Sequence, residues 1–154
     1  MKSILKCTLF VFSALMLMAC SGQMVRVGIS SNSALNPDRK GVPLPVVVRV
    51  YQLNDKGAFE SATFNQIWKN DEGILGGTLL TRNELILNPD SKNKVELDRH
   101  EQAKYVGVVA VFRNPIDRKW RAMRELSDNY VSNKLALSSS FDVSLIGNTL
   151  HITD

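Results

Sequence analysis

The chain has 154 residues, of which 44% are hydrophobic and 22% are charged. That length fits about one globular domain and excludes a multidomain enzyme, and the composition is neither collagen-like nor typical of disordered chains. The formal net charge is +4, but two lysines lie in the segment described next. Without them 17 basic residues face 15 acidic ones, an excess too small to indicate a nucleic-acid partner.

An export signal opens the chain. Lys2 and Lys6 form a short basic head, and residues 7–18 are uncharged and mostly apolar. This run is too short for an ordinary membrane-spanning helix and has the length of the hydrophobic region of a secretory signal peptide. We therefore predict that residues 1–19 are a signal peptide that is removed on export.

The end of this run, Leu17-Met18-Ala19-Cys20, resembles the lipobox of bacterial lipoproteins. The cysteine thiolate of that motif is the nucleophile that receives a diacylglyceryl group. Cys20 is therefore the expected lipidation site, although Met18 stands where a smaller residue is more common. The alternatives are an ordinary signal peptide with an incidental cysteine, and a buried apolar helix.

Lipidation has consequences for the mature chain. Cys7 leaves with the signal peptide, so no pair of free thiols remains for a disulfide. We expect no cofactor besides the covalent lipid, and stable anchoring needs about two acyl chains. Residues 20–24 form a short tether, since about four extended residues reach only ~14 Å. Ser21 resembles the sorting pattern of outer-membrane lipoproteins, so the folded body should lie close to that membrane.

The first half of the remaining chain, residues 25–154, predicts strands and one helical insertion. Apolar and polar residues alternate over 25–30, and β-branched residues are enriched over 46–53, which favours two strands. The helix-like stretch 59–70 places Phe64, Ile67 and Trp68 at helical spacing. We expect the helical insertion to span about residues 59–78.

The second half predicts further strands. Residues 105–112 are apolar on both faces, as in a central strand covered from two sides. A long alternating strand is expected from Leu135 through Leu137 to Leu145, with a terminal hairpin turning at Gly147-Asn148. Weaker strands are expected over 84–88, 95–97 and 120–126. Seven or eight short antiparallel strands without repeats predict a two-sheet β-sandwich.

Motifs of enzymes and metal sites are missing from the sequence. It contains no G-x-S-x-G, no phosphate-binding G-x-x-x-x-G-K, no H-E-x-x-H and no CxxC. His100 and His151 are far apart, and we expect both to be solvated rather than to hold a metal. Trp68 and Trp120 are interpreted as core residues. The glycines at 73, 76 and 77 are expected to permit turns. We therefore predict no catalytic site and no metal site.

One segment is unusual for a passive connector. Residues 31–45 read SNSALNPDRKGVPLP between two predicted strands, and loops beyond ~12 residues are usually functional or disordered. Its prolines restrict the conformations of the free loop and so reduce the entropy lost on binding. This loop is the predicted interaction surface, and the alternative is a passive connector.

Three blocks behind the lipobox resemble the TssJ (SciN-type) lipoproteins of bacterial type VI secretion systems. They are PxPVVVRVYQL over residues 43–53, FxxAxFxxIW over 59–68 with Asp71 and Leu75-Gly76, and YVGVVAVFR over 105–113 followed by Trp120-Arg121. The resemblance covers nearly the whole mature chain. A departure is Asn88-Pro89-Asp90, where a Pro-Gly turn is common.

This resemblance implies a transthyretin-like sandwich with an extra helical element, tethered to the periplasmic face of the outer membrane and without catalytic activity. It also implies that the loop between the first two strands binds the periplasmic C-terminal domain of TssM, an inner-membrane protein that associates with TssL. The expected contact residues in this loop, with Pro37 and Gly41 shaping it, are Asn36, Pro37, Asp38, Arg39, Lys40 and Gly41.

A different function stays open at this point. Sandwich folds host many activities, so the alternative is a lipoprotein module that binds a small ligand or an envelope polymer. An exposed aromatic cluster or a deep pocket would favour that alternative.

Overall fold

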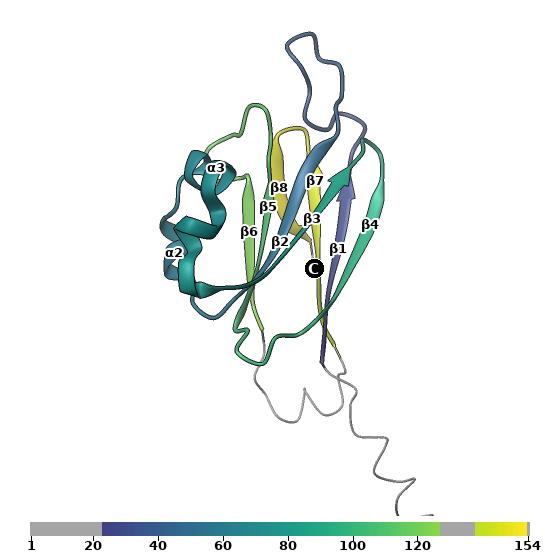
Figure 1. Ribbon diagram of the computed structural model, residues 1–154. Coiled ribbons are helices and arrows are strands. Elements are labelled where there is room, and N and C mark those ends of the chain that lie inside the picture. Colours follow the sequence, from purple (N-terminus) through teal and green to yellow (C-terminus); the bar gives the residue numbers. More distant parts are fainter. Residues whose placement is uncertain (1–22, 127–137, 154) are drawn as a thin grey trace, which may run out of the picture.

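The computed structural model describes residues 23–126 and 138–153. Cys20, and Leu135 and Leu137 of the predicted long strand, lie outside this part. Within it, eight strands form two four-stranded sheets that pack face to face (Figure 1). The strands are β1 (Met24–Ser31), β2 (Val46–Leu53), β3 (Leu79–Leu87), β4 (Lys92–Asp98), β5 (Tyr105–Ala110), β6 (Arg121–Glu125), β7 (Ser138–Ile146) and β8 (Thr149–Thr153). The predicted two-sheet sandwich is confirmed.

The two sheets draw strands from both halves of the chain. One sheet, which we call the β1 sheet, has the order β4-β1-β7-β8, and the other, the β2 sheet, has the order β3-β2-β5-β6. The turn at Asn88-Pro89-Asp90 therefore carries the chain from one sheet to the other. All neighbouring strands are antiparallel except β1 and β7, which are parallel. The predicted terminal hairpin is confirmed as β7 and β8.

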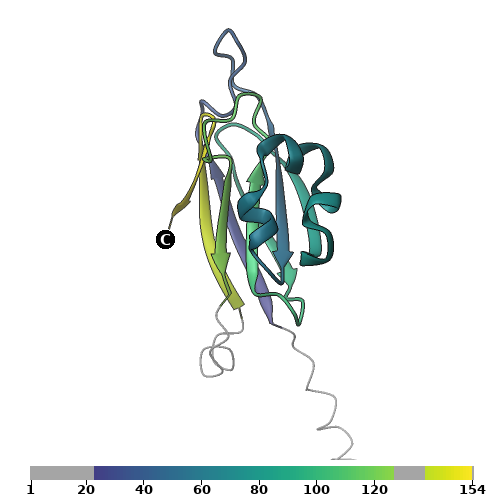
Figure 2. The ribbon, with the colours of Figure 1, turned by 90° about the vertical axis from the view of Figure 1, so that its left-hand side faces the viewer.

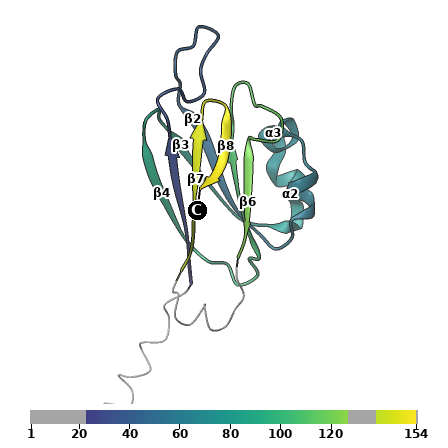
Figure 3. The same ribbon diagram turned by 180° about the vertical axis from the view of Figure 1, so that it is seen from behind.

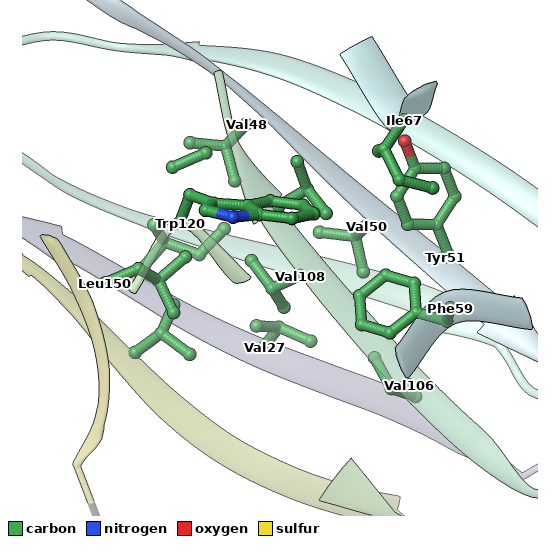
Figure 4. Close-up of a cluster of buried hydrophobic side chains, with 14 of the residues drawn as sticks. Val27, Val48, Val50, Tyr51, Phe59, Ile67, Val106, Val108, Trp120 and Leu150 are labelled. Carbon is green, nitrogen blue, oxygen red and sulfur yellow. The ribbon is translucent and has the colours of Figure 1, made fainter. Parts of the chain in front are cut away.

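The core lies between the inner faces of the two sheets. Val27 of β1 faces Val50 and Val108 of the β2 sheet, and Trp120 and Leu150 close one side of the cluster (Figure 4). These side chains are at most 4% exposed. Trp120 is therefore a core residue, as predicted. Burial of apolar area at about 25 cal/mol per Å² is the main stabilising term of such a core.

Helices cover the outer face of the β2 sheet (Figures 1 and 2), so β5 is covered from both sides as predicted. The expected single stretch 59–70 is instead two helices, α2 (Gly57–Ser61) and α3 (Phe64–Leu75), followed by the 3-10 turn η2 (Gly76–Thr78). The break is set locally, because Thr63 caps α3 in a reciprocal capping box with Gln66. Gly76, at φ +49°, ends α3.

The prediction that Trp68 is a core residue is wrong, since its side chain is 48% exposed. Helix α3 buries Ile67 before its kink at Asn70, and Asp71 and Leu75 after it. The position that follows Ile67 along the helix points about 100° away from it. Trp68 therefore points to solvent, partly supported by Phe64, whose ring stacks against it at 6.3 Å.

The outer face of the β1 sheet carries no helix among the described residues (Figure 3). Its side chains are mainly hydroxyls and charges, which fits a sheet with one solvated face. No helix in residues 23–126 or 138–153 is long and apolar enough to cross a membrane.

Candidate functional site: the protruding loop

The segment 32–45, which we call the protruding loop, extends beyond the sandwich at the end opposite to Met24 (Figure 1). Strand β1 explains this placement. It starts at Met24, spans the sandwich and delivers the chain to the loop after Ser31, a path of about 26 Å at ~3.3 Å per residue. The first described residues and the loop therefore lie at opposite poles of the domain.

Asn36 fixes the base of the loop instead of lying exposed. Its side chain is 3% exposed, its Nδ2 donates to the Pro45 carbonyl at 2.8 Å, and its Oδ1 accepts from the Arg113 amide at 2.9 Å. Its backbone amide donates to the Gly147 carbonyl at 2.9 Å. The expectation that Asn36 is exposed is therefore wrong.

Two features of asparagine suit this position. Asn36 adopts φ +46°, a left-handed conformation that asparagine tolerates better than most residues. Its amide also supplies both a donor, to the Pro45 carbonyl, and an acceptor, to the Arg113 amide. The protruding loop is thereby tied to the neighbouring segments that contain Arg113 and Gly147, and the three form one continuous pole.

The apex of the protruding loop is a closed turn from Asp38 to Val42. The Asp38 amide donates to the Val42 carbonyl at 2.9 Å, and the Gly41 amide donates to the Asp38 carbonyl at 3.1 Å. The Asp38 carboxylate accepts from the amides of Lys40 and Val42 at 2.8 and 2.9 Å. Gly41 has φ +82°, which glycine adopts without strain. The apex is therefore held by its own hydrogen bonds.

The remaining predicted contact residues are distributed along this turn. Pro37 and Asp38 are half-buried, whereas Arg39, Lys40 and Gly41 are exposed. Sequence reasoning missed Val42, an apolar side chain that is 51% exposed at the apex. The only signal for it in the sequence was its place between Gly41 and Pro43.

A second polar cluster lies between α3 and the β2 sheet. Asp71 Oδ2 accepts from the Tyr51 hydroxyl at 2.7 Å and forms ion pairs with Arg49 at 3.1 Å and Arg82 at 2.8 Å. Glu84 pairs with both arginines, at 2.9 and 2.8 Å. Each charge is paired, so this cluster joins the helix to the sheet and offers no free acid or base.

The same cluster stabilises a kink in α3. Asn70 has φ −156° and ψ 56°, which interrupts the helical hydrogen bonding. Arg49 Nη1 donates to the carbonyls of Ile67 and Trp68 at 3.2 and 3.3 Å, and the Asp71 carboxylate accepts from the Glu72 amide at 3.1 Å. Burial, followed by the hydrogen bond to Asp71, raises the pKa of Tyr51 above its ordinary value, so its phenol stays a donor.

Other places for chemistry are sparse in the described residues. His100 and His151 are exposed, as predicted, and no group of three or more His, Cys, Asp or Glu side chains in this part of the chain is arranged to hold a metal ion. Two hollows on the outer face of the β1 sheet share Gly28 and Asp142 and are open to solvent. Neither is a deep pocket.

Comparisons with known proteins agree with the geometry. The chain resembles the crystal structure of the T6SS lipoprotein TssJ1 from Pseudomonas aeruginosa, with 25% identity and a TM-score of 0.74 over 86% of this chain and 95% of that one. It resembles a chain of a solved "Type VI membrane complex", with 28% identity and a TM-score of 0.74 over 86% and 98%. It also resembles a chain in a structure described as "T6SS protein TssM C-terminal domain" from EAEC, with 25% identity and a TM-score of 0.68 over 86% and 98%.

The comparison with curated proteins gave no match. A family model described as "Type VI secretion lipoprotein, VasD, EvfM, TssJ" matches residues 23–145, which include the protruding loop, both helices and nearly all of β7. The resemblance noted from the sequence is thereby confirmed. This chain belongs to the family of type VI secretion lipoproteins that includes TssJ.

Proposed function

We propose that this lipoprotein, anchored through Cys20 in the outer membrane on its periplasmic face, couples that membrane to the periplasmic C-terminal domain of TssM, and through TssM indirectly to TssL. The single observation that carries the proposal is that the start of β1, the strand that follows the proposed tether, and the protruding loop lie at opposite poles of the sandwich. An adaptor between two partners needs its attachment points on different faces.

The tether side of the domain supports this arrangement. Gln23 is already bonded to the body, because its carbonyl accepts from the Arg99 amide at 2.7 Å and its side-chain oxygen accepts from Arg99 Nη1 at 3.3 Å. Three Cα steps separate Cys20 from Gln23, at most about 11 Å. A lipid on Cys20 would therefore hold this pole against the headgroups and direct the protruding loop away from the membrane.

The proposed action is mechanical. Acyl chains hold one pole, the sandwich transmits force through two packed sheets, and the protruding loop engages the partner. Each buried CH2 of an acyl chain contributes about 0.8 kcal/mol, so two or three chains give a durable anchor. No step in this action requires a catalytic group.

The anchor is tested by Cys20→Ser in the full-length protein, with Cys7→Ser as the matched control inside the signal peptide. The Cys20→Ser variant should lose labelling by radioactive palmitate, and cells that carry it should lose type VI secretion. Cells that carry Cys7→Ser should keep both the labelling and the secretion. Normal secretion by unlipidated Cys20→Ser would refute the anchoring role.

The partner is tested by replacing residues 38–43 with two glycines. The hydrogen bonds that residues 38–43 make within the described part of the chain stay inside the turn. The variant should therefore fold with an unchanged unfolding midpoint and lose co-purification with the TssM periplasmic domain. Unaltered co-purification would exclude the loop as the coupling element.

One observation favours a second candidate, binding of an envelope polymer. Trp68 is exposed and stacked on Phe64, with Lys69 Nζ 5.8 Å from the Trp68 ring centroid, and aromatic faces of this kind bind apolar faces of ligands. Retention of the lipidated protein, but not of its Trp68→Ala variant, by purified peptidoglycan sacculi would support that function.

A further inference from the structure

We propose that the apex of the protruding loop inserts Val42 into an apolar pocket with an acidic rim on its partner, while Arg39 and Lys40 lie over that rim. This inference rests on the proposed function, because it names the chemistry that the partner must present to the loop. Five observations carry it: the preformed turn, the hydrogen bonds of the Asp38 carboxylate within that turn, the exposure of Val42, the exposed cations at the apex and the basic pole around them.

The apex is preformed. Two backbone hydrogen bonds and two bonds to the Asp38 carboxylate close residues 38–42. Below this turn the Leu44 amide donates to the Leu35 carbonyl at 3.0 Å, and the Leu35 side chain is fully buried. A turn fixed at its apex and at its base loses little conformational entropy on binding, so its exposed side chains contribute more of their contact energy to affinity.

Asp38 shapes the apex through hydrogen bonds within the turn. Its Oδ1 accepts from two amides of the turn, its own amide and carbonyl are both bonded within the turn, and the residue is half-buried. Carboxylates that close turns in this way stabilise one backbone conformation. Asp38 is therefore a positioning residue for Arg39, Lys40 and Val42.

Val42 has the properties of an anchor. It is 51% exposed and belongs to the closed turn of the protruding loop, which extends beyond the sandwich (Figure 1). It is flanked by Gly41 and Pro43, which are small or rigid and leave it accessible. A valine gains roughly 1.5–3 kcal/mol on full burial. Few residues in an interface contribute that much, and they insert into desolvated pockets.

The exposed charges around Val42 are mostly positive. Arg39 and Lys40 are exposed at the apex, and the neighbouring loop, bonded to Asn36 through the Arg113 amide, exposes Arg113, Arg118 and Lys119 against Asp117. Complementary charge across an interface accelerates association and suppresses wrong partners. The partner surface that fits this pole is therefore acidic around an apolar centre.

The experiment measures binding of the lipidated protein in detergent micelles to the TssM periplasmic domain, with association and dissociation rates recorded at about 0.05 and about 0.5 M salt. Val42→Ser should raise the dissociation rate by about tenfold or more with little change in association. Arg39→Gln with Lys40→Gln should slow association about fivefold at low salt and flatten its salt dependence. Matched controls are Ile86→Ser, an exposed apolar residue on β3, and Lys69→Gln with Lys104→Gln, which remove the same charge elsewhere.

The outcomes separate this inference from the proposed function. If the two-glycine replacement of residues 38–43 abolishes binding but Val42→Ser behaves like Ile86→Ser, the Val42 anchor is wrong and the coupling role stands. If the Arg39/Lys40 and the Lys69/Lys104 double variants slow association equally, the net charge of the protein and not the apex steers the encounter. The inference of an acidic rim on the partner is then wrong. If the two-glycine variant binds normally, the loop is not the coupling element and both proposals fail. Unchanged circular dichroism and unfolding midpoints establish that each variant is folded.

Discussion

A Cβ atom at Gly107 would lie 2.8 Å from Cζ of Phe59 and 2.9 Å from its Cε2. The aromatic ring of α2 therefore rests directly on the backbone of the central strand β5 (Figure 4). Phe59 is 1% exposed and meets Tyr51 edge to face with ring centroids 6.2 Å apart. A side chain larger than that of glycine would push the ring away, so this close approach is one of the contacts that hold α2 against the β2 sheet.

Gly107→Ala should therefore destabilise the domain. The added methyl group forces the Phe59 ring away from the strand, and overpacking of this kind costs about 1–3 kcal/mol. Urea unfolding followed by circular dichroism measures the change. Gly77→Ala is the matched control, because a Cβ at Gly77 meets nothing within 4 Å. Equal stability of the two variants would show that α2 moves freely on the sheet.

Protonation of Asp71 should weaken the domain in acid. Burial, the largest single influence, raises the pKa of Asp71, but hydrogen bonds from Tyr51 and Arg82 and the charge of Arg49 together outweigh it and hold the pKa below its ordinary value. The folded state therefore binds fewer protons than the unfolded state. The stabilisation is present above about pH 4 and is lost as the pH falls through the lower folded pKa.

Asp71→Asn tests this linkage. At neutral pH the variant should be less stable by about 2 kcal/mol or more, since two arginines lose their shared carboxylate. Below about pH 4 the difference from the parent should shrink, because the parent carboxylate is protonated there as well. Unfolding free energies across this pH range measure the effect, with Asp117→Asn, an exposed carboxylate, as control. If the unfolding free energies of Asp71→Asn and the parent differed by the same amount at all pH values, the lowered pKa of Asp71 in the folded state would be contradicted.

Arg121 joins the end of α2 to the β2 sheet. Its guanidinium donates to the carbonyls of Phe59, Glu60 and Ala62, the last at 2.8 Å, and lies 4.7 Å from the Trp120 ring centroid. A lysine ammonium lacks the planar fork that reaches three carbonyls at once. Arg121→Lys should cost about 1–3 kcal/mol, measured by thermal unfolding. Arg118→Lys, at an exposed side chain, should change the unfolding temperature little. A similar loss of stability there would argue against the role of Arg121 in joining α2 to the sheet.

Asn36 should be required for the shape of the protruding loop. Asn36→Gly keeps the left-handed backbone but removes both amide bonds, and Asn36→Ala also adds strain at φ +46°. We expect losses of about 1–2 kcal/mol for glycine and more for alanine. Both variants should be cut faster by protease within residues 37–44, which mass spectrometry of the fragments detects. Wild-type resistance in both would show that the loop base is held by other contacts.

Local patterns of the sequence predicted much of the fold. The alternation over 25–30, the β-branched run 46–53 and the Gly147-Asn148 turn are short-range signals, so the strands and the terminal hairpin follow from them directly. The lipobox and three ordered blocks also identified the family. These features depend on neighbours along the chain, which is why they can be read without coordinates.

Contacts between distant residues decided the rest. Asn36 looks like an exposed loop residue until Arg113 and Gly147 are folded against it, and Trp68 looks like a core residue until Ile67 and Asp71 turn the other face of α3 inward. The parallel pairing of β1 with β7 likewise has no local signature. Composition and periodicity report which side chains avoid water on average, whereas the partner that each polar or aromatic group finds is fixed only when strands far apart in sequence meet.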